Sequence, residues 1–333
     1  MLTNVTVDTV VEGKTLPLLI QAANVKNTGE WLAENKDELT RLLHRHGALL
    51  FRGFGVLGAE AFEQFIVGAS SSDWVEYREA ATPRSHISGN VYTATDYHPD
   101  HRIYLHNENS HVMTWPGRLF FHCEVPPETG GATPIADCRK VYSGIDPAVR
   151  RRFLDEGWRY VRSFGFGLGF PWRKAFGVDT REELSRYCAD NFMKADWIDS
   201  DKLRITYRRW AALKHPDTED DTWFNHGLFY NVWNLTGSQK EFVKALGAER
   251  MPYNTYYGSG EPIATDVLQH LDEVYQGEQV RFSWQEGDVM MVDNMLAAHG
   301  RESYTGQRSV LVGMTGLTNG RPLSHPSTYS LPT

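Results

Sequence analysis

Residues 284–314 read WQEGDVMMVDNMLAAHGRESYTGQRSVLVGM, and this stretch decides the fold. It contains two short apolar runs, Val289–Asp293 and Ser309–Met314, with glycine-containing turns before and between them, a pattern typical of strands in an antiparallel sheet. Further strands are predicted at Gly117–Val125 and Gln279–Trp284. Because helical patterns are concentrated towards the N-terminus, we predict a mainly β protein with helices (α+β), built on a β-barrel or jelly-roll core with flanking helices.

Outside this stretch, runs of apolar residues at helical spacing alternate with short strands and a long polar segment. Gly47 is predicted to end the first helix, because glycine readily adopts the left-handed conformation of a C-cap. The predicted segments are a helix at Glu30–His46, a strand at Ala48–Phe54, a helix at Ala59–Ala69, a long loop system at Tyr77–Asn109, and helices at Asp137–Glu156 and Arg181–Met193. Since no repeat or linker divides the sequence, residues 1–333 are predicted to form one domain, with an aromatic lid insertion at about 160–225.

Composition argues against several classes of partner. The 333 residues carry a formal net charge of −8 and contain no basic run, so nucleic acid is not expected as a partner. The cysteines, Cys123, Cys138 and Cys188, are too few for a disulfide framework and fit a reducing compartment. No signal-peptide pattern or stretch of ~18 apolar residues is present. We therefore expect a cytoplasmic protein that acts on a small molecule and has no membrane partner.

Two histidines and one glutamate are the candidate metal ligands. His106 and Glu108 lie two residues apart, and on an extended strand such residues point to the same face, so both could reach one ion. A single His-x-Glu also occurs by chance in polar edge strands. A third candidate, His299, follows the strand predicted at Val289–Asp293 and would lie at the mouth of the barrel.

Two histidines and a carboxylate form the facial triad of non-haem iron(II) oxygenases, which leaves coordination positions open. The 2-oxoglutarate co-substrate could occupy two of these positions and dioxygen a third. Arg308 lies nine residues after His299. A turn at Gly306 is predicted to start a strand antiparallel to Val289–Asp293, which would bring Arg308 back to the metal. Its planar guanidinium would suit the far carboxylate of 2-oxoglutarate, although Arg308 could also be a surface arginine at a strand start.

Many spaced motifs in one order resemble the TauD/TfdA superfamily of 2-oxoglutarate-dependent dioxygenases, and within it the SyrP-like branch. The matching motifs are Phe51–Phe54, Thr82–Arg84, Tyr92–Thr95, His106–Glu108, Phe120–Cys123, Gly130–Pro134, Ala136–Asp137, Trp223–Asn225, Tyr257–Ile263, Gly287–Asp288, Asp293–Asn294 and His299–Arg301, with Gly306 and Arg308. The resemblance implies a double-stranded β-helix fold and the use of iron(II), 2-oxoglutarate and dioxygen.

The resemblance also assigns roles to individual residues. It places iron on His106, Glu108 and His299, and 2-oxoglutarate on Arg308 and Thr133. Halogenases of this superfamily have a small residue at the position of Glu108, so hydroxylation is implied here. Further candidates, for contacts with the substrate, are Arg84, Asn107, Asn225 and Arg301, with a buried ion pair as the alternative role of Arg301.

Two positions depart from the family pattern. Many relatives have a tyrosine at the position of His111, and relatives tend to have a glutamine at the position of His226. Both differences affect the expected polarity of the substrate pocket and leave the predicted iron ligands unchanged.

These observations predict a 2-oxoglutarate-dependent iron dioxygenase. The predicted reaction is hydroxylation of an unactivated carbon of an amino acid or amino-acid-derived small molecule, free or bound to a carrier protein, in a biosynthetic pathway. Desaturation, epoxidation and cyclisation use the same metal chemistry and are alternatives. A metal-dependent hydrolase and a non-catalytic cupin-like sensor are alternatives of other classes, and neither needs Arg308 or Thr133. The substrate itself and the oligomeric state are left open by the sequence.

Overall fold

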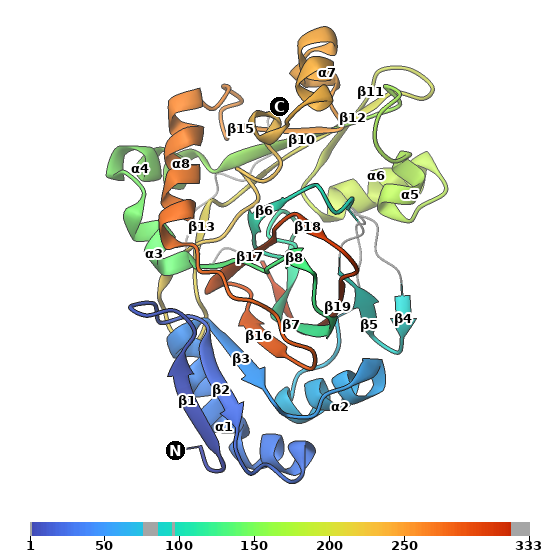
Figure 1. Cartoon of the computed structure of the whole chain (residues 1–333). Helices are drawn as coiled ribbons and strands as arrows, with labels where there is room; N and C mark the ends of the chain where they lie inside the picture. Colours follow the sequence, from blue (N-terminus) through green and yellow to red (C-terminus); the bar gives the residue numbers. More distant parts are fainter. Residues whose placement is uncertain (1, 76–85, 95–96, 321–333) are drawn as a thin grey trace.

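An eight-stranded sheet forms the main wall of the molecule in the computed structural model, which describes residues 2–75, 86–94 and 97–320 (Figure 1). Neighbouring strands of this sheet are antiparallel except β2 and β3. In spatial order the strands are β1 (Val5–Thr9), β2 (Leu18–Ala22), β3 (Ala48–Arg52), β16 (Val289–Asp293), β7 (Thr114–Val125), β19 (Ser309–Asn319), β5 (Val91–Thr93) and β4 (His86–Ser88).

A smaller sheet faces this wall and completes a jelly roll. Its strands, in order, are β6 (Ile103–His106), β17 (Ala297–Arg301) and β9 (Ile135–Asp137). Apolar side chains of both sheets, among them Leu119, Phe121, Ile135 and Ala297, share one buried core. A short pair, β18 (Tyr304–Thr305) and β8 (Thr129–Gly130), extends one end. The predicted mainly β fold with a jelly-roll core is confirmed.

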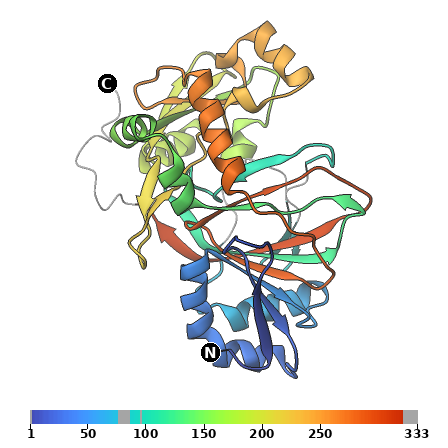
Figure 2. The same cartoon turned by 60° about the vertical axis from the view of Figure 1, so that its left-hand side comes forward.

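Helices α1 (Thr28–His46) and α2 (Gly58–Ala69) cover the outer face of the wall. Their buried side chains form a core with Phe51, Phe120 and Leu311 of the sheet. Gly47 ends α1 in the left-handed conformation with φ 78°, and its N–H donates to the carbonyl of Leu43, as predicted. Figure 2 shows this N-terminal layer on the side of the jelly roll opposite to the remaining helices.

A second, four-stranded sheet lies over the end of the jelly roll that carries β6 and β17 (Figures 1 and 2). Trp158 and Tyr160 of this sheet pack in one core with Leu105 and Ala298, so the two parts are in direct contact. Its strands, in order, are β11 (Lys194–Trp197), β12 (Leu203–Arg209), β10 (Trp158–Phe164) and β15 (Tyr253–Tyr257). The sheet occupies much of the segment predicted as a lid; movement of that segment stays a prediction.

The remaining elements surround these sheets. They are α3 (Cys138–Gly144), α4 (Pro147–Glu156), α5 (Trp172–Phe176), α6 (Arg181–Asp190), β13 (Ala212–Lys214), β14 (Asp221–Trp223), η1 (Val232–Asn234), α7 (Ser238–Leu246), η2 (Ala248–Arg250) and α8 (Thr265–Glu278). Within the described ranges, no helix combines the length and apolarity needed to cross a bilayer.

Four predictions about the local structure outside the metal centre were wrong. The predicted loop Tyr77–Asn109 contains β4, β5 and β6 within its described part. The predicted strand Gln279–Trp284 makes only an isolated bridge at Val280. The helix predicted at Asp137–Glu156 is broken before Pro147, because a proline has no N–H for the helical bond and the Asp146 side chain caps a new helix there.

The fourth error concerns how the chain returns to the site after His299. β16 and β19 both pair with β7 in antiparallel fashion, so they run parallel to each other on either side of it. The prediction that the strand after Gly306 lies antiparallel to Val289–Asp293 is therefore wrong. Arg308 nevertheless reaches the predicted site, because β19 borders the interior of the jelly roll.

Candidate metal centre

The structure brings the three predicted metal ligands together. Donor atoms of His106, Glu108 and His299 all lie within 4.8 Å of one another. The two histidines are direct partners in the β6–β17 pairing, and their ring centroids are 4.4 Å apart. Glu108 and His299 are 6% and 5% exposed. A buried set of two imidazoles and one carboxylate is the donor set that suits iron(II).

Glu108 reaches the site by a different route from the one predicted. β6 ends at His106, and Glu108 lies in the turn that follows. The turn is held by Asn294, whose Oδ1 accepts from the N–H of Glu108 at 2.7 Å and whose Nδ2 donates to its carbonyl at 2.9 Å. Nδ2 also donates to the carbonyl of Pro116 at 2.8 Å. The carboxylate therefore approaches His106 because an amide side chain fixes the backbone on both sides of Glu108.

The ring of His106 is oriented by its own strand. Its Nδ1 lies 2.8 Å from the carbonyl oxygen of Tyr104. Because a carbonyl can only accept, Nδ1 carries the hydrogen and the lone pair lies on Nε2. This tautomer is the one that a metal ligand needs.

A cavity adjoins the two histidines. It is lined by His106, His299, Thr133, Arg301 and Arg308 together with apolar side chains. Thr133 and Arg308, the residues predicted to contact 2-oxoglutarate, thus lie on one cavity with two of the candidate metal ligands.

The polar atoms of this cavity are arranged for an anionic ligand. Arg308 donates from Nε to the carbonyl of Gly131 at 2.9 Å and from Nη2 to Oγ1 of Thr133 at 3.3 Å. Oγ1 also accepts from Nε1 of Trp284 at 3.1 Å. Since both lone pairs of Oγ1 are used, the hydroxyl can act towards a ligand only as a donor.

The charge of Arg308 also favours an anionic ligand. Burial, followed by the charge of Arg301, lowers the pKa of Arg308 to about 10. Arg308 is still charged at neutral pH, but its charge is poorly solvated, so a bound carboxylate would be favoured. This property fits a dicarboxylate co-substrate.

The other candidates for substrate contacts occupy different environments. Asn107 donates to the carbonyl of Asn294, and Asn225 bridges the carbonyl of Ala211 and the N–H of Gly227. Both amides are thus bound to backbone near the site. Arg84 lies outside the described residues.

Arg301 has a positioning role in the structure. Its guanidinium donates to the carbonyls of Tyr97, His98 and His101 at 2.8–3.0 Å, and so fastens the loop before β6 to the cavity. Its predicted contact with the substrate stays a prediction.

Sequence reasoning missed the aromatic surroundings of the metal centre. Phe229 and His226 lie against His106 with centroid distances of 4.6 and 5.3 Å, and Phe121 lies 5.0 Å from His299. The sequence analysis identified His226 as a departure from the family pattern but did not predict where it lies. Only the tertiary structure brings it beside His106.

The jelly roll, the buried two-histidine, one-carboxylate set and the cationic cavity beside it define the class of a mononuclear non-haem iron oxygenase. Residues 12–315 match the family described as taurine catabolism dioxygenase TauD, TfdA family, and the chain belongs to this family. The predicted dioxygenase class and its requirement for iron(II), 2-oxoglutarate and dioxygen are thereby confirmed.

Individual relatives are similar over most of their length. The chain is 33% identical over 277 residues to the dapdiamide synthesis protein DdaC of Enterobacter agglomerans, covering 83% of this chain and 84% of that protein. It is 30% identical over 290 residues to a clavaminate synthase-like protein of Arabidopsis thaliana, covering 84% of each. The crystal structure of PvcB from Pseudomonas aeruginosa shares the fold, with a TM-score of 0.56, 14% identity, and coverage of 94% of this chain and 91% of PvcB.

Proposed function

We propose that this dioxygenase hydroxylates an unactivated carbon of an amino acid or an amino-acid-derived small molecule, free or carrier-bound, in a biosynthetic pathway. The observation that carries the proposal is the cavity in which the Arg308 guanidinium and the donor hydroxyl of Thr133 lie beside His106 and His299. Similarity to a protein named for dapdiamide synthesis supports a biosynthetic role.

In this proposal, separate residues bind the metal and the 2-oxoglutarate. His106, Glu108 and His299 hold iron(II), which together with 2-oxoglutarate and dioxygen supplies the oxidising power for inserting oxygen into a C–H bond. Arg308 and Thr133 bind the far carboxylate of 2-oxoglutarate, and the nearby charge of Arg301 adds to the attraction. Phe121, Val310 and Val312 line the same cavity and keep water away from the reacting groups.

The presence of Glu108 supports hydroxylation over halogenation, because its carboxylate would fill the coordination position that a halide would need. Desaturation, epoxidation and cyclisation would be recognised by the mass of the product. A cytoplasmic location belongs to the same proposal and is supported by the small number of cysteines, three in 333 residues, all of them buried.

Anaerobic titration with iron(II) and 2-oxoglutarate tests the proposed site. We expect the charge-transfer band of an iron–keto-acid chelate to develop in the wild-type protein. The variant Arg308→Gln should bind 2-oxoglutarate more than about 30-fold more weakly, since loss of one partner from a buried charged pair costs roughly 2–5 kcal/mol.

The matched control is Arg281→Gln, because the Arg281 side chain is 59% exposed and pairs with Glu302 at the surface. It should titrate like the wild type. Absence of the band in the wild-type protein, or equal affinities in the two variants, would contradict the proposed site. Release of succinate on addition of dioxygen, measured against free amino acids and their carrier-bound forms, then identifies the substrate; turnover without 2-oxoglutarate would instead favour a hydrolase.

A further inference from the structure

A cluster of polar and aromatic side chains lies beside the metal centre, on the side of His226. We define it as the histidine compartment, made of His111, His226, Tyr160, Tyr230 and Arg162. The ring of His226 lies 5.3 Å from that of His106 and 4.8 Å from that of His111. The compartment therefore touches a candidate iron ligand through His226, and His111 lies one ring further away.

The second sheet supplies the far wall of this compartment. Tyr160 of β10 lies 5.9 Å from His111 in an edge-on arrangement, and Tyr230, in the turn before η1, lies 5.4 Å from it. Arg162 follows Tyr160 by two residues on β10, so both side chains point to the same face of the sheet. Arg162 is 6% exposed, which makes it a buried cation facing the same region.

Both ring nitrogens of His111 are left unused. His226 is hydrogen-bonded, with Nδ1 2.6 Å from Oγ of Ser110. His111 is 2% exposed, and neither of its ring nitrogens has a hydrogen-bond partner in the described part of the chain. An unsatisfied buried polar group destabilises the folded state, so a fold retains one mainly where a ligand or a function uses it.

The charges around His111 indicate which ligand would pair with it. Burial, and then the charges of Arg162 and Arg209, hold the pKa of His111 well below its usual range. The ring is thus a neutral imidazole in a positive field, and it offers one N–H donor and one acceptor. A carboxylate would accept from the N–H and be attracted by the guanidinium groups.

The rings of His111 and His226 are in contact, and that of His226 also lies against His106, so both side chains border the same region next to the metal centre.

We propose that His111 and Arg162 bind the carboxylate of the primary substrate, and that His111 and His226 together make the enzyme selective for a free amino acid or a similar small carboxylic acid. An amino acid held as a carrier thioester has no free α-carboxylate, so for recognition of that group the inference selects the free acid from the two substrate forms considered above. It rests on the proposed function, because the substrate must bind next to the iron and 2-oxoglutarate.

The test uses the full-length protein loaded anaerobically with iron(II) and 2-oxoglutarate. The probes are the twenty proteinogenic L-amino acids, added singly, and the amides of those that bind. We expect at least one amino acid to perturb the charge-transfer band, and its amide to bind at least about tenfold more weakly. If the band forms but no amino acid perturbs it, or if acid and amide bind alike, the inference is overturned while the proposed function stands.

Variants separate recognition from folding. His111→Phe keeps a ring but removes both nitrogens, whereas His111→Gln keeps a donor and an acceptor. The phenylalanine variant should retain the band and the wild-type affinity for 2-oxoglutarate but bind the amino acid at least about tenfold more weakly, and the glutamine variant should recover part of this loss. Wild-type affinity for the amino acid in His111→Phe would overturn the inference.

Arg162→Gln gives an independent readout in case His111→Phe does not fold. It should abolish the discrimination between acid and amide. Its control is Arg159→Gln on the same strand, because Arg159 points to the other face and donates to the carbonyls of Gly258 and Ser259. Retained discrimination in Arg162→Gln would count against the carboxylate contact. Loss of the charge-transfer band in the wild-type protein would instead refute the proposed function.

Discussion

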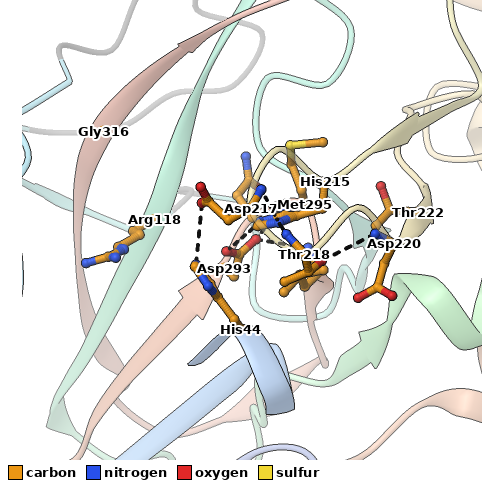
Figure 3. A network of polar contacts seen from close by, with 12 residues as sticks. His44, Arg118, His215, Asp217, Thr218, Asp220, Thr222, Asp293, Met295 and Gly316 are labelled. Carbon is orange, nitrogen blue, oxygen red and sulfur yellow. Dashed lines mark hydrogen bonds and ion pairs between the residues drawn. The ribbon is translucent and has the colours of Figure 1, made fainter. Parts of the chain in front are cut away.

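Two clusters of histidine and carboxylate in this protein have similar composition and different chemistry. One consists of His106, Glu108 and His299, and the other of His44, His215 and Asp217. In each cluster the donor atoms lie within 4.8 Å of one another. Figure 3 shows the second cluster, in which His44 of α1 approaches the loop that carries His215 and Asp217. Proximity alone therefore does not distinguish a metal centre from a structural network.

The backbone distinguishes the two clusters by setting the tautomer of a histidine. Nδ1 of His106 donates to a carbonyl, so the lone pair is on Nε2. Nδ1 of His215 instead accepts from the N–H groups of Asp217 and Thr218 at 3.3 and 3.1 Å. Its Nε2 therefore carries the hydrogen and donates to Oδ2 of Asp293 at 3.1 Å. A protonated nitrogen cannot bind a metal, so the second cluster acts as a hydrogen-bonded clamp.

The clamp supports the metal centre through one turn. Oδ1 of Asp293 accepts from the N–H groups of Met295 and Leu296, while Oδ2 accepts from His215 (Figure 3). The next residue, Asn294, holds the backbone of Glu108. Asp293 is thus a partner of the clamp, and the adjacent Asn294 holds the backbone of a candidate metal ligand.

The largest expected contrast is in metal binding. Alanine at His106, Glu108 or His299 should reduce iron affinity by more than about 100-fold and abolish succinate release, because even partners of metal ligands contribute about 10–100-fold. Alanine at His44 or His215 should leave one equivalent of iron bound. Iron content after desalting, measured by atomic absorption, checks both expectations. Two bound equivalents in the wild type, with one lost in the His215 variant, would contradict the assignment of the clamp.

A smaller effect is expected at Asn294, which contacts Glu108 without belonging to the metal-binding set. Asn294→Ala removes the hydrogen bonds to both backbone groups of Glu108, so the carboxylate should lose its fixed position. We expect iron affinity to fall by about 10–100-fold. The affinity can be measured by competition with a chelator. Unchanged affinity would mean that the turn after β6 holds Glu108 without Asn294.

The clamp itself is expected to contribute to stability. His215→Phe removes the histidine partner of Asp293 Oδ2 and of the N–H groups of Asp217 and Thr218, which should lower the free energy of unfolding by about 1–3 kcal/mol. Iron affinity should change much less than in Asn294→Ala. Urea unfolding of the metal-free proteins measures the difference. A variant as stable as the wild type would show that these groups find other partners.

The contrast between the clusters also explains what the sequence could and could not predict. The candidate iron ligands were predictable because His106 and Glu108 are neighbours in sequence and His299 follows a recognisable strand. The strand geometry assumed for Glu108 was wrong, because the position of its turn depends on Asn294, a distant residue. The tautomer of His215 depends on two backbone N–H groups in a turn, and its partner Asp293 is remote in sequence. Neither the hydrogen bonds from the turn nor the pairing with Asp293 produces a recognisable pattern in the local sequence.

The same reasoning applies to the fold. The apolar runs predicted the central strands, and Gly47 predicted the end of α1, because these features depend on local sequence. The parallel relation of β16 and β19 follows from the shared neighbour β7, which only the whole sheet determines. The second sheet was missed as a sheet because its strands are spread over residues 158–257 and separated by helices.

The smallest expected effect concerns His44 and the pH dependence of stability. Burial lowers the pKa of His44 below its usual 6.5, against the opposing attraction of Asp293 and Asp217. The folded protein therefore prefers the neutral ring, so this contribution to stability is present above pH 6.5 and is lost as the pH falls through the lowered folded-state value. His44→Gln should make the free energy of unfolding fall less steeply with decreasing pH in this range. Urea unfolding of both proteins between about pH 5 and 7.5 tests the expectation around the ordinary histidine pKa. If the contact of His44 Nε2 with Oδ2 of Asp217, at 3.6 Å, dominated instead, the folded state would favour the proton and the variant would show a steeper fall.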